Sequence, residues 1–190
     1  MPYSPTLHHR RSIRLKGYDY SQSGVYFVTI CVQDHVCMFG EVENGTMILN
    51  DVGKMAMRCW MDIPQHFPNV VLHEYVVMPN HIHGIIQITN DGGNAGENVG
   101  AKNFSPLPPT LPSPSPPSPS PRFVPTGTSR TIGSIVRGFK IGVTKQLGYS
   151  VWQRDYWERI IRDDDAYQNI TRYIINNPVN WRNDDLNKKQ

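Results

Sequence analysis

The sequence predicts an α+β protein built on an antiparallel sheet, and three observations lead to this prediction. Short apolar runs rich in β-branched and aromatic residues occur at 25–32, 70–78 and 82–89, as is typical of buried strands. A break of only a few residues separates the second run from the third, which favours antiparallel pairing. Apolar residues spaced three and four apart at 50–66 and 131–147 indicate amphipathic helices.

The first half of the chain is expected to begin with a central strand. The run 25–32 reads VYFVTICV and is nearly all apolar, so both of its faces should be covered. The Asn-Gly pair at 44–45 predicts a hairpin that joins 39–43 to 46–49. A helix should follow over 50–66, because an Asn-Asp pair can cap its start and two prolines end it.

In the second half, the helix at 131–147 buries isoleucine, valine and phenylalanine and exposes basic residues. A short edge strand is expected within 151–161. Three aspartates at 163–165 suit a helix N-terminus, so a last helix should run from 164 to 176 or 177 and end before Pro178. The resulting βαββαβ order predicts a ferredoxin-like or RRM-like sheet with helices on one face and a further C-terminal helix.

Residues 90–128 interrupt this pattern with a low-complexity insertion. Ten of the chain's 16 prolines lie between 106 and 125, in Pro/Ser alternation that favours a solvated polyproline spacer. Neither flanking half is large enough to bury a good core alone, so we expect one domain over residues 1–190. PxxP-like segments also bind other proteins, so the insertion is a candidate site for a protein partner.

Composition excludes several classes of protein. Four Trp, nine Tyr and six Phe among 190 residues argue against a wholly disordered chain. Three cysteines without a CxxC pair argue against a disulfide framework and a zinc knuckle. There is no apolar signal core and no run of the roughly 20 apolar residues that cross a bilayer. We expect a cytoplasmic protein without a membrane partner.

The basic residues are concentrated in two segments, a basic N-terminal arm at about 1–20 and the stretch 130–162. They are Arg10, Arg11, Arg14, Lys16, Arg130, Arg137, Lys140, Lys145, Arg154, Arg159 and Arg162. Together they are 11 of the 19 Lys and Arg residues, although the net charge is only +3. Such clustering favours contact with a polyanion, and a solvated surface explains it equally well.

Two histidines form the first candidate site. His81 and His83 lie two residues apart in an expected strand, so both imidazoles should face one side and Ile82 the other. Imidazole pairs at this spacing suit a divalent metal. Two surface histidines are the alternative, and the apolar neighbours of the pair count against it.

A tyrosine and an asparagine form the second candidate site. Tyr173 and Asn177 lie four residues apart in the expected last helix, so they share a face one turn apart. A tyrosine hydroxyl there can act as a nucleophile, and an amide oxygen can ligate a metal. Alternatively, Tyr173 is a core aromatic and Asn177 ends the helix before proline.

Taken together, five segments resemble the single-tyrosine HUH transposases of the insertion-sequence-200-like family, and most closely the REP-associated tyrosine transposases. The segments are YFVTICVQD at 26–34, VVMPNHIHGII at 76–86, IGSIVRGFK at 132–140, WQRDYWERIIRD at 152–163 and YIINNPVNW at 173–181. The resemblance covers about residues 10–182 apart from the insertion.

The resemblance implies a role for each matching residue. His81, His83 and Asn177 would bind Mg²⁺ or Mn²⁺, and Tyr173 would attack single-stranded DNA to form a 5′-phosphotyrosine that a second 3′-OH can reseal. It also implies hairpin DNA with an adjacent unpaired stretch as substrate, and either a monomer or a homodimer. Tyr156 and Tyr167 are rival nucleophiles by residue type, but neither has a ligand-type residue four positions on.

The basic segments would then contact DNA phosphates, and Trp152, Tyr156 and Trp157 are candidates to stack on unpaired bases unless they belong to the core. The main alternative is a non-catalytic module, derived from such a transposase, that binds single-stranded nucleic acid. A metal-dependent hydrolase of small phosphate esters has suitable ligands, but it leaves the basic arm unexplained.

Overall fold

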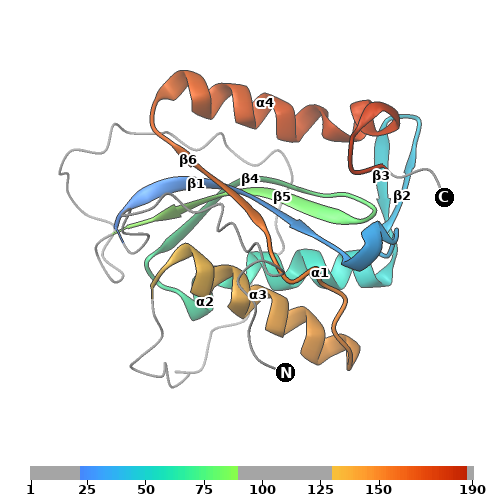
Figure 1. Cartoon of the computed structure of the whole chain (residues 1–190), viewed down its shortest axis with the longest axis horizontal. Helices are drawn as coiled ribbons and strands as arrows, with labels where there is room; N and C mark the ends of the chain where they lie inside the picture. Colours follow the sequence, from blue (N-terminus) through green and yellow to red (C-terminus); the bar gives the residue numbers. More distant parts are fainter. Residues whose placement is uncertain (1–21, 90–129, 188–190) are drawn as a thin grey trace, which may run out of the picture.

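A computed structural model describes residues 22–89 and 130–187 of the chain. They form a four-stranded antiparallel sheet with the strand order β4-β5-β1-β6 (Figure 1). Its strands are β1 (Gly24–Cys31), β4 (Val70–Val77), β5 (His81–Ile88) and β6 (Trp157–Ile161). This arrangement confirms the predicted α+β fold with its antiparallel sheet and C-terminal helix.

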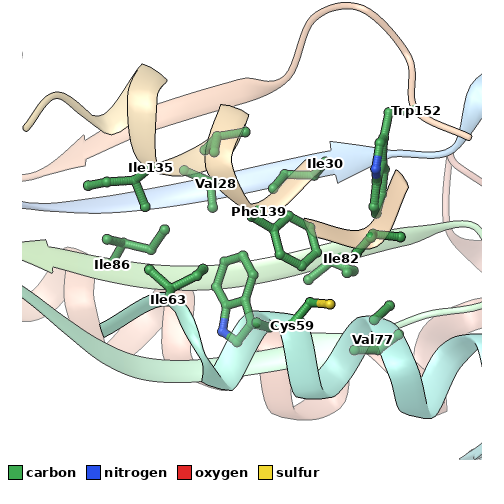
Figure 2. Close-up of a cluster of buried hydrophobic side chains, with 14 of the residues drawn as sticks. Val28, Ile30, Cys59, Ile63, Val77, Ile82, Ile86, Ile135, Phe139 and Trp152 are labelled. Carbon is green, nitrogen blue, oxygen red and sulfur yellow. The ribbon is translucent and has the colours of Figure 1, made fainter. Parts of the chain in front are cut away.

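One face of the sheet carries the main core. Helices α1 (Asp51–Met61) and α3 (Ile132–Leu147) pack together beneath it (Figure 1). The core includes Trp60 of α1 and Phe139 of α3, whose rings meet edge to face with centroids 5.4 Å apart. Figure 2 shows Ile82 of β5 among these side chains, together with Val28 and Ile30 of β1. Alternate residues of each strand therefore point to this side, as the strand period requires.

The opposite face is covered by α4 (Asp164–Asn180), as Figure 1 shows above the sheet. Ile170 and Ile174 of this helix pack with Val25 of β1 and Ile85 of β5 in a second, smaller cluster. The helix begins at Asp163, whose carboxylate accepts from the Ala166 amide at 2.7 Å. The sheet is thus enclosed by α1 and α3 on one side and by α4 on the other.

The predicted hairpin is present as β2 (Gly40–Glu43) and β3 (Thr46–Leu49). Asn44 and Gly45 both have positive φ, 50° and 77°, as a two-residue turn of this kind requires. The predicted helix 50–66 divides into α1 and a single turn, α2 (Ile63–His66), because Pro64 starts a new turn after Asp62. Short 3-10 turns complete the elements: η1 (Gln33–His35) and η2 (Trp181–Asn183).

The short edge strand expected within 151–161 is confirmed as β6, which begins at Trp157 and follows an approach segment in which Trp152 forms an isolated bridge with Val32. One predicted boundary was wrong. The last helix does not end before Pro178 but continues through it to Asn180. A proline in the last turn removes only one backbone hydrogen bond, and the amide of Trp181 still closes on the Pro178 carbonyl.

The predicted basic arm with Arg10, Arg11, Arg14 and Lys16, and the proline-rich insertion, lie outside the described residues. Within the described ranges, no helix combines the length and the apolar character that crossing a membrane requires.

Candidate metal and tyrosine site

The two histidines lie side by side at the start of β5. Their ring centroids are 4.4 Å apart, and the side chains are only 0% and 3% exposed. His81 and His83 face α4, while Ile82 between them enters the core on the other side of the sheet. They are therefore not surface histidines, and a buried pair of imidazoles needs partners to offset the loss of water.

Asn80 fixes the orientation of the first imidazole. Its amide nitrogen donates to two backbone carbonyls, that of His35 at 3.0 Å and that of Leu186 at 2.8 Å. This leaves the amide oxygen to accept from Nδ1 of His81 at 2.8 Å, so the proton of a neutral His81 ring is on Nδ1. Nε2 then carries a lone pair, and it is buried without a hydrogen-bond partner among the described residues.

The second imidazole is held between a threonine and the tyrosine. Nδ1 of His83 lies 2.8 Å from the Thr29 hydroxyl on the adjacent strand β1. Its Nε2 lies 3.2 Å from the hydroxyl of Tyr173. Phe27 stacks on the imidazole with ring centroids 5.3 Å apart and meets Tyr173 edge-on. The ring is thus fixed on three sides, and Nε2 is directed toward the tyrosine.

Helix α4 supplies the other two predicted residues. Tyr173 is 47% exposed, so it is not a core aromatic, and its hydroxyl reaches His83. Asn177 is 1% exposed and lies inside the helix, which continues to Asn180, so it does not end the helix. Its amide oxygen is buried and has no hydrogen-bond partner among the described residues. The structure therefore brings the two sequence motifs together across α4 and β5.

Asp184 is a member of the site that the sequence analysis missed. It follows η2, and its carboxylate accepts from the Asn177 amide at 3.1 Å and from the Leu186 backbone amide at 2.7 Å. One oxygen of this carboxylate and one nitrogen each of His81 and His83 all lie within 4.8 Å of one another. No spacing signal marks Asp184, because an irregular segment after the helix brings it back to the sheet.

The surroundings keep both imidazoles neutral. Burial, assisted by nearby His35, lowers the pKa of His81 to about 3. Burial and the adjacent His81 hold the pKa of His83 well below its usual range, and Asp184 opposes this only in part. The pKa of Tyr173 is raised, mainly by burial and then by Asp184, while the Asn177 amide acts in the opposite direction. At neutral pH the site therefore presents two neutral imidazoles and a protonated tyrosine.

The donor set fits a divalent cation. It combines imidazole nitrogens, which suit transition metals, with an amide oxygen and a carboxylate oxygen, which suit Mn²⁺ and Mg²⁺. Two of these atoms, Nε2 of His81 and Oδ1 of Asn177, are buried polar atoms without a hydrogen-bond partner in the described part of the chain. Buried polar atoms normally have partners, so these two atoms are available to a cation.

The two rival tyrosines lie in different surroundings. Tyr167 is 8% exposed, and its hydroxyl lies 3.1 Å from Nδ1 of His73 on β4. The hydroxyl of Tyr156 donates to the Glu158 carboxylate at 2.7 Å. Of the three tyrosines, it is Tyr173 whose hydroxyl contacts the histidine pair.

Several of the predicted DNA-contact residues gather in one cleft beside α3. The cleft has a volume of about 500 Å³, and its lining includes Arg137, Lys140, Lys145, Arg154, Trp152 and Tyr156. Trp152 is also part of the core at 7% exposed. Lys140 is engaged locally, since its ammonium donates to the backbone carbonyls of Gln153 and Asp155 at 2.7 and 3.1 Å. Arg130, Arg159 and Arg162 are exposed outside this lining.

Comparison with known proteins shows which proteins this chain is similar to. No family model matches the chain. An uncharacterized protein of Haemophilus influenzae is 45% identical over 189 residues, which cover 97% of this chain and 96% of that protein. A second Haemophilus influenzae protein, named "Putative REP-associated tyrosine transposase", is 24% identical over 161 residues, covering 85% of this chain and 73% of its own. The chain therefore shares a family with the uncharacterized protein, and it is similar to a protein named as a REP-associated tyrosine transposase.

The fold agrees with this similarity in sequence. A solved REP-associated tyrosine transposase, bound to a REP hairpin, superposes with a TM-score of 0.53 at 20% identity. The match covers 90% of this chain and 74% of that one. The resemblance inferred from the five sequence segments is therefore supported by a relative of that name and by a shared fold.

Proposed function

We propose that the protein is a metal-dependent transposase that cleaves and rejoins single-stranded DNA, with Tyr173 as the nucleophile. The observation that supports this most directly is the 3.2 Å contact between the Tyr173 hydroxyl and Nε2 of the buried His83. A protein that only binds DNA does not require a tyrosine hydroxyl in contact with a metal-type histidine pair. His81, His83, Asn177 and Asp184 would hold Mg²⁺ or Mn²⁺.

The surroundings of Tyr173 favour its protonated form in this arrangement. Its pKa is raised by burial and by Asp184, so the hydroxyl keeps its proton at neutral pH and is a weak nucleophile. Nε2 of His83 has a single lone pair, so it either accepts the tyrosine hydroxyl or ligates a cation. A bound divalent ion supplies positive charge that stabilises a phosphodiester under attack and offsets the carboxylate of Asp184.

Attack by Tyr173 forms a bond between its oxygen and phosphorus and breaks the bond to the 3′ oxygen. The tyrosine proton is transferred away, and the departing oxygen leaves as a 3′-OH after taking up a proton. The product is a 5′-phosphotyrosine, which conserves the phosphodiester bond for a second 3′-OH. Thr29 and Asn80 hold the two imidazoles in fixed orientations throughout, which favours a productive geometry.

We propose a folded hairpin with an adjacent unpaired stretch as the DNA substrate. The related solved transposase is bound to a REP hairpin. The cations of the α3 cleft, Arg137, Lys145 and Arg154, together with Arg130, Arg159 and Arg162, provide contacts for its phosphates. Arg10, Arg11, Arg14 and Lys16 of the arm are proposed to add to these contacts.

A covalent-adduct assay tests this proposal. Labelled single-stranded hairpin DNA from beside the protein's own gene is incubated with Mg²⁺ or Mn²⁺ and run on a denaturing gel. The wild type should give a metal-dependent protein–DNA band, and Tyr173→Phe should give none while it still shifts the DNA on a native gel. Tyr149→Phe is the matched control, because this exposed tyrosine follows α3 and should keep full activity. A native shift with no adduct on any strand would support a non-catalytic binding module instead.

A further inference from the structure

The edge strand β6 carries two exposed residues on the face of the sheet that holds the catalytic tyrosine. Ile161 lies opposite Val25 in the register, and both pack in the cluster beneath α4. Side chains alternate along a strand, so Trp157 and Arg159 point to this same face. Trp157 lies directly opposite Thr29, the residue that holds His83.

Helix α4 packs mainly on β4 at the far edge of the sheet and leaves the Trp157 end of β6 exposed. Trp157 is 66% exposed, and Arg159 is also exposed. The chain's other three tryptophans, Trp60, Trp152 and Trp181, are at most 8% exposed. Trp157 is therefore the tryptophan that has no core to stabilise, although it lies on an otherwise ordered strand.

The exposed pair is close to the proposed chemistry. Thr29 of β1 lies between β6 and β5. It is opposite Trp157 of β6, and its hydroxyl is 2.8 Å from Nδ1 of His83 on β5. Two strand spacings, about 10 Å, thus separate the backbones of Trp157 and His83. Arg159 lies opposite Phe27, whose ring stacks on His83. A DNA strand with a phosphate at Tyr173 would extend over Trp157 if it ran toward β6.

We propose that Trp157 stacks on an unpaired nucleobase flanking the scissile phosphate, and that Arg159 binds a phosphate of the same strand. This inference rests on the proposed function for the position of the scissile phosphate. An indole face stacks on any base, and an adjacent guanidinium matches the charge of the backbone. A base inside a duplex has both faces stacked already, so the pair selects single-stranded DNA.

Tryptophan fluorescence tests the contact directly. Because Trp157 is the exposed tryptophan of the four, it should account for most of the quenching by acrylamide. A short oligodeoxythymidine should protect it from acrylamide, whereas a duplex of equal length should protect it less. Trp157→Phe should remove both the quenchable signal and the protection.

Affinity for the same oligodeoxythymidine gives a second measurement. Trp157→Ala should weaken binding by about 5- to 150-fold, the range that loss of one stacked base produces, and Trp157→Phe should retain most of the affinity. Arg159→Gln should reduce the salt dependence of binding by about one phosphate contact. Tyr149→Ala, which removes an aromatic side chain that is 57% exposed and follows α3, is the control and should bind like the wild type.

The inference is overturned if Trp157→Ala binds the oligonucleotide as tightly as the wild type, if the wild type does not bind it, or if acrylamide still reaches Trp157 at saturation. These measurements need no catalysis, so they separate this inference from the proposed function. Protection of Trp157 without a covalent adduct would support stacking and reject the transposase. A covalent adduct formed while Trp157 stays accessible to acrylamide would support the transposase and reject the stacking.

Discussion

The buried histidine pair should make the metal-free protein unusually sensitive to mild acid. Burial lowers the pKa of His81 to about 3 and holds that of His83 well below its usual range. In the unfolded chain both take up a proton near pH 6.5. Below that pH the unfolded state binds protons that the folded state does not, so stability falls as pH falls. For His81 this loss continues until the pH approaches 3, where the folded protein is protonated too.

The size of the effect follows from linkage. Each histidine kept neutral by folding removes about 1.4 kcal/mol of unfolding free energy per pH unit below 6.5. At pH 5.0 this amounts to about 2 kcal/mol for each imidazole, or roughly 4 kcal/mol for His81 and His83 together. The loss is comparable with a large part of the total stability of a small domain.

Urea unfolding at pH 7.5 and 5.0, with a chelator present, measures this difference. The wild type should lose about 4 kcal/mol more than the double variant His81→Gln/His83→Gln between these two pH values. His66→Gln removes an exposed histidine from α2 and should behave like the wild type. The reasoning would be refuted if the double variant and the wild type showed the same pH dependence.

Three further predictions concern single residues. Asn80→Ala removes the hydrogen bond that orients the His81 ring, so calorimetry should show Mn²⁺ binding weakened by about 10- to 100-fold. An unchanged Mn²⁺ affinity would count against a role of Asn80 in positioning His81. Gly84→Ala would place a Cβ against the ring of the buried Trp60, so urea unfolding should show a loss of about 1–3 kcal/mol, and a neutral effect would contradict this packing. Lys140→Met removes the donor to the backbone carbonyls of Gln153, Arg154 and Asp155, so urea unfolding should show a loss of about 1–3 kcal/mol, and an unchanged stability would mean that these contacts contribute little.

Local patterns were sufficient to predict the sheet and the histidine pair. The strand period alone separates His81 and His83 from Ile82, and the structure has the first two facing α4 and the third in the core. The helical period likewise places Tyr173 and Asn177 on one face of α4. Such regular elements are predictable because each side-chain direction follows from its position in the element.

Asp184 and the role of Asn80 could not be predicted in this way. Asp184 lies in an irregular segment, so no period relates it to the histidines, and only the folded chain brings its carboxylate to the site. The amide of Asn80 is oriented by the carbonyls of His35 and Leu186, which are distant in sequence. The end of α4 was mispredicted because Pro178 was expected to break the helix, as proline does in a helix interior. Pro178 lies instead in the last turn, where the helix tolerates it.

The most direct test of the central claim is to identify the amino acid that carries the DNA. The covalent adduct formed with single-stranded hairpin DNA and Mn²⁺ is trimmed with nuclease, digested with trypsin and sequenced by mass spectrometry. The account predicts a nucleotide on Tyr173, whose hydroxyl contacts the histidine pair. A nucleotide on Tyr156, on Tyr167 or on any other residue would contradict it.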